Sequence, residues 1–222
     1  MRTPVEPGAR VTEEEIRRAL EERAAGGRAA LPARLAVVEL VPAGYETVQV
    51  QPIAVAELDA FRKGVGGDAP LFERAETIPA PFLPVTVDLA NLRYQAARFG
   101  ADGLLLLTRG SNSYSYANGW AFLYPTIVGL AFAPGNTREV WTAAAAVLLD
   151  VSSGRPLAVI EAEARVDGQY LVFSDEWAAN RDIDEEARTC LFHDIGERLR
   201  ERAGELRLSQ GLPARPQGLS SK

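Results

Sequence analysis

The stretch from Asp88 to Arg165 constrains the fold of this chain more than any other part of the sequence. Asp88 is a helix-capping residue type, and apolar side chains follow it at helical spacing as far as Phe99. Gly100 then supplies the left-handed conformation that ends a helix. Residues 103–109, with four consecutive leucines, predict a central strand directly after this helix. A helix that leads straight into a buried strand is typical of α/β proteins.

The second half of this stretch predicts two strands joined by a tight turn. Residues 139–151 are apolar on both faces, which predicts an interior strand. The turn Asp150-Val151-Ser152-Ser153-Gly154 follows, and Gly154 is expected to hold a positive φ. The return strand, residues 156–166, alternates apolar and charged side chains, so one face is expected to meet the core and the other to meet solvent.

Weaker signals complete the expected architecture. Thr12 and Glu15 form a capping box for a helix that runs to about Ala25, packing at the sheet edge or extending away. Further elements are expected at 35–41 (a buried strand), 55–63 (a short helix) and 72–83 (one short strand at most). A last helix is expected from about Asp182, with an apolar stripe at Ala187, Leu191, Ile195, Leu199 and Ala203.

The fold class that follows is α/β. We expect a mixed sheet of about four to five strands flanked by helices, with a long apolar insertion before the last hairpin. A chain of 222 residues suits one domain, here residues 11–208, with the insertion at 110–136. Residues 1–10 are expected to be a flexible leader and residues 209–222 a disordered tail.

Composition excludes several classes of function. The net charge is -6, with 30 acidic and 24 basic residues, so nucleic acid is not an expected partner. Cys190 and His193 are the only residues of their types, which rules out an internal disulfide and a Cys/His metal cluster. No phosphate-binding loop or Gly-x-Gly-x-x-Gly motif is present, and no cofactor is expected.

Two runs carry a resemblance to a known group of proteins. In residues 94–106 a helix ends in Gly-Ala-Asp before a leucine-rich strand, and in residues 146–157 an Asp-Val-x-x-Gly turn joins two strands. Together they resemble the α/β lipoproteins of bacterial envelopes, a group that includes the curli secretion channel lipoprotein and the penicillin-binding-protein activator lipoproteins. Residues 124–136 are also similar to the rhombotarget lipoproteins.

The resemblance implies a location and a kind of partner. The protein would be periplasmic and membrane-anchored in its full-length form, through a signal peptide and a lipidated cysteine upstream of Met1. Its partner would be another envelope protein or a second copy of itself. The group offers no catalytic residues that map onto this sequence.

The charge-free segment from Gly119 to Pro134 has two interpretations. It is shorter than a membrane-spanning helix and contains Pro125 and Gly129, so a buried segment that closes the core is favoured. The alternative is a surface for a membrane or a partner. The preceding Ser/Asn/Tyr run, residues 111–118, predicts either a strand extension or a polar loop with exposed tyrosines, which is favoured, or the lining of a ligand groove or contact surface. The candidate interaction surface from these segments is Tyr114, Tyr116, Trp120, Tyr124, Ile127 and Phe132.

Residue types that often carry catalysis do not form a recognisable constellation. Cys190 and His193 lie three residues apart on the last helix without a Gly-x-Ser-x-Gly elbow, so a buried cysteine and a partly exposed histidine are expected. Glu161 and Glu163 share one strand face about 7 Å apart, a separation that the two carboxylates of a glycosidase can have. Glycosidase carboxylates flank a sugar cleft from different elements, so a solvated sheet face is favoured for this pair. The acidic residues at 182 and 184–186 are expected to favour a helix N-terminus.

The best-supported function is therefore a non-enzymatic envelope lipoprotein body that binds or assembles with other envelope components. One alternative is an oligomeric secretion-channel lipoprotein in which residues 110–136 build the pore. A second alternative is a hydrolase, which the missing constellation disfavours.

Overall fold

The structure is a computed structural model, and it describes residues 11–25, 33–43, 48–66, 72–84, 87–123, 133–171 and 176–209. Its strands are β1 (Ala33–Pro42), β2 (Val48–Pro52), β3 (Phe72–Thr77), β4 (Gly103–Ala117), β5 (Asn136–Asp150) and β6 (Pro156–Tyr170). Its helices are α1 (Glu13–Ala25), α2 (Val55–Gly66), α3 (Leu89–Arg98) and α5 (Glu176–Ser209), with short 3-10 turns η1 (Ala80–Phe82) and η2 (Gly119–Leu123).

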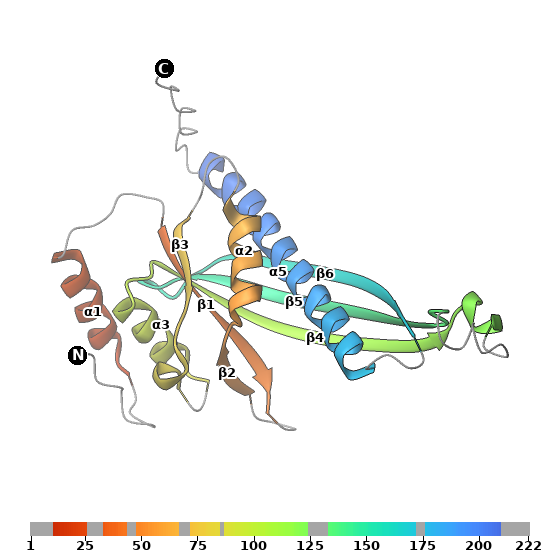
Figure 1. Ribbon diagram of the computed structural model, residues 1–222. Helices are drawn as coiled ribbons and strands as arrows, with labels where there is room; N and C mark the ends of the chain where they lie inside the picture. The colour runs from red at the N-terminus through yellow and green to blue at the C-terminus, as the bar shows by residue number, and fades with distance from the viewer. Residues whose placement is uncertain are drawn as a thin grey trace, which may run out of the picture.

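The six strands form one mixed sheet, which confirms the predicted fold class (Figure 1). The strand order is β2-β1-β4-β5-β6, with β3 also paired to β1. β1 runs parallel to β3 and β4, and the other neighbouring strands are antiparallel. The sheet has more strands than the sequence predicted, because β2 lies in a short segment for which no strand was expected.

Strands β4, β5 and β6 are much longer than the others. Each has 15 residues, or roughly 50 Å of extended chain at the usual rise. Pairing of β1 with β4 ends at Thr108, whereas β4 and β5 stay paired as far as Ala117 and Asn136. The three strands therefore project beyond the rest of the sheet as a three-stranded arm, residues 109–117, 136–144 and 162–170 (Figure 1).

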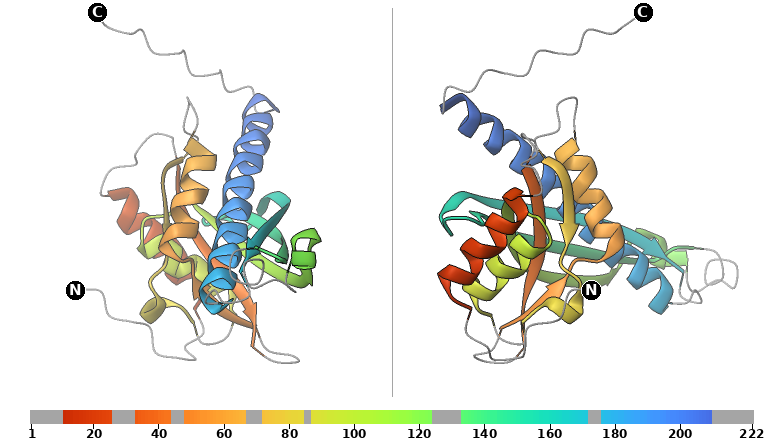
Figure 2. Two further views of the ribbon diagram at one scale, coloured as in Figure 1. Left: turned by 45° about the vertical axis from the view of Figure 1, so that its right-hand side comes forward. Right: turned by 90° about the vertical axis from the view of Figure 1, so that its left-hand side faces the viewer.

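Helices cover the two faces of the sheet unequally (Figures 1 and 2). One face carries α2 and α5, and α5 packs along β5 and β6 into the arm. The apolar side chains predicted for α5 lie here: Ala187, Leu191, Ile195 and Leu199 are fully buried. The other face carries α3, with α1 packed on α3, near the start of β4 and far from the arm.

Local sequence signals act where they were predicted. Thr12 Oγ1 accepts from the Glu15 amide at 3.3 Å, and the Glu15 carboxylate accepts from the Thr12 amide at 2.8 Å, which completes the capping box. The Asp88 carboxylate accepts from the Ala90 amide at 3.0 Å. Gly100 and Gly154 hold positive φ values of 80° and 71°.

Several expectations need correction. Helix α5 begins at Glu176, six residues before Asp182, so the acidic residues at 182 and 184–186 lie beyond its first turn. Asp184 instead forms an ion pair with Arg138 of β5 at 3.0 Å. Helix α1 packs onto α3, where Glu13 pairs with the buried Arg93. Strand β5 is not covered on both faces: Ala143 and Ala145 are exposed, because no described helix reaches that side of the arm.

Candidate interaction surface

The uncovered side of β4, β5 and β6 is the candidate functional surface. Side chains alternate between the two faces of a strand, so every second residue of these strands points away from α5. The burial pattern of β5 shows this directly, since exposed and buried residues alternate from Trp141 to Ala146. We call this surface the open face. It comprises Thr108, Gly110, Asn112, Tyr114 and Tyr116 of β4, Glu139, Trp141, Ala143 and Ala145 of β5, and Glu161, Glu163, Arg165 and Asp167 of β6.

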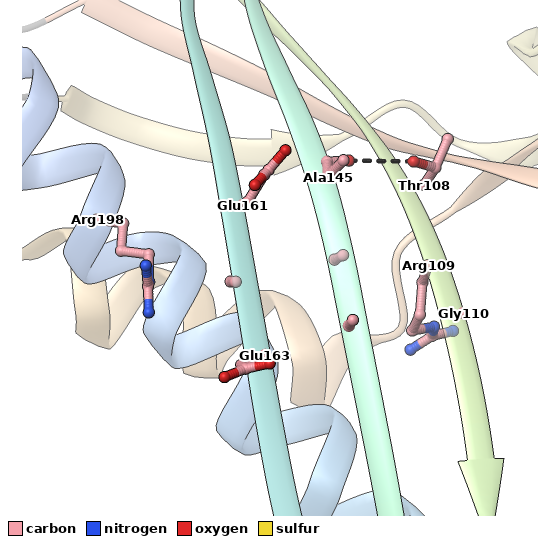
Figure 3. Close-up of a pocket in the computed structure, with 10 residues that line it drawn as sticks. Thr108, Arg109, Gly110, Ala145, Glu161, Glu163 and Arg198 are labelled. Carbon is pink, nitrogen blue, oxygen red and sulfur yellow. Dashed lines mark hydrogen bonds between the residues drawn. The ribbon is translucent and has the colours of Figure 1, made fainter.

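A shallow trough crosses the open face where its side chains are small. Two adjoining depressions, of about 660 Å³ and 610 Å³, share Gly110, Ala143 and Glu163 in their linings. Figure 3 shows the first of them. A Cβ atom added to Gly110 would meet nothing within 4 Å. Because glycine and alanine carry almost no side chain, another polypeptide can approach the strands closely here.

A pre-organised cluster forms one wall of the trough. The guanidinium of Arg165 lies 5.3 Å from the centre of the Trp141 ring, and its Nε is 2.9 Å from Glu139 Oε1. The Trp141 indole N–H also donates to Glu139. Trp141 remains 52% exposed, so it presents a large aromatic surface whose orientation is already fixed by its neighbours.

The trough has an acidic edge on the outer strand. Glu161 and Glu163 are exposed on β6, and neither has an ion-pair partner among the described residues. Arg198 of α5 lies beside this strand (Figure 3). Its charge is paired within the helix, because its Nε lies 2.8 Å from Asp194 Oδ2. The exposure of the two glutamates agrees with the solvated face that was expected for them. Their carboxylates place negative charge at the rim of the trough.

The predicted surface residues that the structure describes are exposed. Tyr114, Tyr116 and Trp120 are 62%, 51% and 52% exposed, and Tyr114 receives a hydrogen bond from the Asn112 side chain at 3.0 Å. This confirms the strand extension with exposed tyrosines that was favoured for residues 111–118. The remaining three, Tyr124, Ile127 and Phe132, lie outside the described residues. The buried segment favoured for residues 119–134 is wrong for residues 119–123, where Trp120 and Phe122 are exposed and none is buried.

Sequence reasoning missed Trp141, because it treated the whole of residues 139–151 as an interior strand. A signal was available in the sequence. Trp141 is followed by Thr142 and then by four alanines, residues 143–146. A strand that packs large side chains on both faces would not normally contain so many small residues in a row. One tryptophan among small residues indicates a strand face with little side-chain volume beside a single large aromatic ring.

The opposite face contains a buried charge network with a structural role. Arg109 of β4 contacts Glu39 of β1 at 3.0 Å and Glu57 of α2 at 2.9 Å, and Arg188 of α5 reaches Glu57 at 3.3 Å. Burial raises the pKa of Glu39 above its ordinary value, although the Arg109 charge opposes this shift. Two acids and two arginines balance, so the network joins α2 and α5 to the sheet without leaving a charge free for a ligand.

Cys190 and His193 both lie on the solvent-facing side of α5. The expectation of a buried cysteine was wrong, because the covered stripe of this helix passes through Leu191 and Phe192 instead. His193 faces Glu197 one turn later, at 3.7 Å. Within the described parts of the chain, no three His, Cys, Asp or Glu side chains are grouped to hold a metal ion.

The fold and the open face together define an α/β protein with a one-sided, aromatic β-sheet arm. No protein-family model matches the sequence, and neither does any curated protein. Among solved structures it is similar to protein XCC0632 of Xanthomonas campestris, from family DUF330, at 13% identity over 80% of this chain and 89% of that one, with a TM-score of 0.36.

Protein CT253 of Chlamydia trachomatis is similar at 11% identity over 78% of this chain and 98% of that one, with a TM-score of 0.40. Lipoprotein GNA1162 of Neisseria meningitidis is similar at 15% identity over 72% and 98% of the two chains, with a TM-score of 0.29. Several of the similar structures are thus bacterial lipoproteins. At these TM-scores the likeness carries no conclusion about what this chain does.

Proposed function

We propose that this chain is the non-enzymatic body of a periplasmic, membrane-anchored envelope lipoprotein, and that it binds another envelope protein through the open face. The observation that carries the binding proposal is the unequal covering of one sheet. Strand β5 buries Ala144 and Ala146 under α5, and on its other side it exposes Ala143, Ala145 and Trp141. The envelope assignment is supported by the resemblance of residues 94–106 and 146–157 to the envelope lipoprotein group.

The chemistry of the open face favours binding over catalysis. Two pairs of its polar side chains are bound to each other, Asn112 with Tyr114 and Arg165 with Glu139. Among the described residues, the face holds no nucleophile with an adjacent base. What it offers is exposed aromatic area, a floor without side chains and an acidic rim. These are the features of a protein-binding surface with an aromatic anchor beside a hollow.

Site-specific photo-crosslinking in the native cells tests this proposal. A photoreactive residue at Ala143 or Tyr114 is expected to give one discrete heavier species, whereas the same residue at Cys190, exposed on the outer side of α5, is expected to give none. Adding Ala143→Arg should remove the species formed from Tyr114, since the bulky charge fills the trough. Equal crosslinking from all three positions, or from none, would contradict the proposal.

Two readouts separate the components of the proposal. A crosslinked species of twice the chain mass identifies self-association in place of a different partner. Cell fractionation checks the location independently, and recovery in the cytosolic fraction would overturn the envelope assignment while leaving the binding surface intact.

A further inference from the structure

The end of the arm is free of charge over an unusual length of sequence. Residues 110–137 contain no Asp, Glu, Lys, Arg or His. The chain is 24% charged, so about seven charged residues would be expected in a stretch of this length. Surfaces that face water alone normally carry both signs of charge. The absence of charge at this end therefore points to surroundings other than water.

The structure places exposed aromatic side chains at the extreme end of this stretch. We call residues 118–123, which contain η2, the tip. Trp120 and Phe122 are 52% and 74% exposed there. The tip lies at the end of the arm that is remote from α1 and α3, well beyond β1 and β2 (Figure 1). Two large aromatic side chains are thus presented at a point that the described helices and the shorter strands do not reach.

Asn118 makes the tip a preformed structure. Its side-chain amide donates to the Pro134 carbonyl at 2.7 Å and to the Thr137 hydroxyl at 2.8 Å. The Asn118 side-chain oxygen accepts from the Trp120 backbone amide at 2.9 Å, and the Asn118 backbone amide donates to the Gly135 carbonyl at 2.7 Å. Paired backbone groups matter at a lipid surface, because an unpaired amide or carbonyl costs several kcal/mol in hydrocarbon.

The polarity of the arm changes in steps along its length. Beyond the tip comes the row of Tyr116, Thr137 and Gln169, which carries hydroxyl and amide groups but no charge. On the open face the next row, Tyr114, Glu139 and Asp167, contains the first charges, about 7 Å further back. On the covered face Arg138 lies one residue nearer to the tip, where its charge is paired with Asp184 at 3.0 Å. The arm thus has an apolar end, followed by tyrosine hydroxyls and then by charged groups. A bilayer interface presents the same order of polarity from the acyl chains outward.

We propose that the tip inserts into the headgroup and acyl-chain boundary of a lipid bilayer, with Trp120 and Phe122 as the anchoring side chains. A lipid surface fits better than a protein partner here, because the tip lacks the charged groups that would orient a specific protein and has the stepped polarity just described. The association is reversible and depends little on salt, since no charge takes part. Its two anchoring residues lie outside the open face, and the insertion does not depend on the partner proposed above.

Tryptophan fluorescence of the whole chain tests this inference. Trp141→Phe and Trp177→Phe leave Trp120 as the single tryptophan. With phosphatidylcholine vesicles, its emission is expected to shift to the blue, and vesicles with brominated acyl chains are expected to quench it. In vesicle flotation, Trp120→Ser with Phe122→Ser should weaken binding on the order of tenfold or more.

A matched pair controls for general hydrophobicity. Leu157 and Val159 are 44% and 63% exposed at the other end of β6, and Leu157→Ser with Val159→Ser should leave flotation unchanged. Circular dichroism confirms that both double variants are folded. The inference is overturned if wild-type protein does not float, if bromine fails to quench Trp120, or if high salt abolishes binding. Loss of flotation with intact crosslinking from Ala143 would leave the proposed function standing.

Discussion

Gly154 holds the turn between β5 and β6 at a φ of 71°, directly against a buried arginine. A Cβ atom at this position would lie 3.0 Å from the Arg93 guanidinium. That guanidinium donates to the Val151 and Ser152 carbonyls at 3.0 Å and 2.9 Å, so it cannot move without losing bonds. The turn thus depends on glycine for two reasons, its backbone angle and the space it leaves.

Replacing Gly154 with valine is expected to destabilise the protein by about 1 kcal/mol or more, because both the angle and the contact become strained. Denaturant unfolding measures the change. Gly110→Val is the matched control, since Gly110 lies in β4 where a Cβ meets nothing within 4 Å and β-branched residues are favoured. Similar losses in both variants would refute the role given to the turn.

Asp150 is the titrating group of the same turn. Burial alone would raise its pKa, but hydrogen bonds from the Ser152 and Ser153 hydroxyls and the Ser153 amide lower the pKa below the ordinary 3.8. A lowered pKa means that the charged carboxylate stabilises the folded state at pH above the unfolded pKa. This stabilisation is lost as the pH falls through the folded pKa.

The variant Asp150→Asn is therefore expected to be less stable than the wild type at neutral pH. The difference in the free energy of unfolding should shrink as the pH falls below about 3.8. Urea unfolding across acid and neutral pH measures it. A difference that stays constant with pH would show that the charge of Asp150 contributes nothing to the turn.

At the scale of elements, α2 and α5 cross at two glycines. A Cβ on Gly64 would lie 2.2 Å from the His193 carbonyl oxygen, and one on Gly196 would lie 2.5 Å from the Phe61 carbonyl oxygen. Each glycine therefore faces backbone of the other helix, which cannot give way as a flexible side chain can. This contact brings α2 onto α5 and closes the core over Leu58 and Phe61.

Gly64→Ala is accordingly expected to cost about 1–3 kcal/mol or more, despite the better helix propensity of alanine. Gly66→Ala tests the same substitution in the same helix at a site with no atom within 4 Å, and it should be neutral or slightly stabilising. Thermal unfolding of the pair measures both. Two stabilised variants would mean that the helices do not approach as closely as described.

At the scale of the whole molecule, the protein has one covered and one open side along its arm. Neighbouring residues of β5 report on the two sides: Ala144 is 7% exposed and packs with the α5 core, whereas Ala143 lines the trough. The network of Arg109, Glu39 and Glu57 lies on the covered side, so the two sides differ in electrostatics as well as in packing.

Arginine at position 143 and arginine at position 144 should therefore differ strongly in their effect on the stability of the fold. Ala143→Arg is expected to change the free energy of unfolding by no more than about 0.5 kcal/mol, as at other surface sites. Ala144→Arg buries an unpaired charge under α5 and is expected to cost several kcal/mol or to prevent folding. Expression in soluble form and denaturant unfolding distinguish them, and an equal loss in both would show that the open face is covered.

The sequence by itself determined the local features of this protein. The capping box at Thr12, the stop at Gly100, the turn at Gly154 and the alternation of β6 were all predictable. Each depends on interactions within a few residues, so the signal and its effect lie together in the chain. The fold class followed because these local elements occur in an order typical of mixed sheets.

Only the tertiary structure decided which surfaces are covered. Strand β4 continues to Ala117 through a polar Ser/Tyr run because β5 pairs with it in unbroken register. Ala143 and Ala144 have the same chemistry, and their different exposure follows from the position of α5, which is 30 or more residues away in sequence. Burial is a relation between distant segments, so neither the open face nor the exposure of Trp141 and Cys190 could be predicted from local patterns.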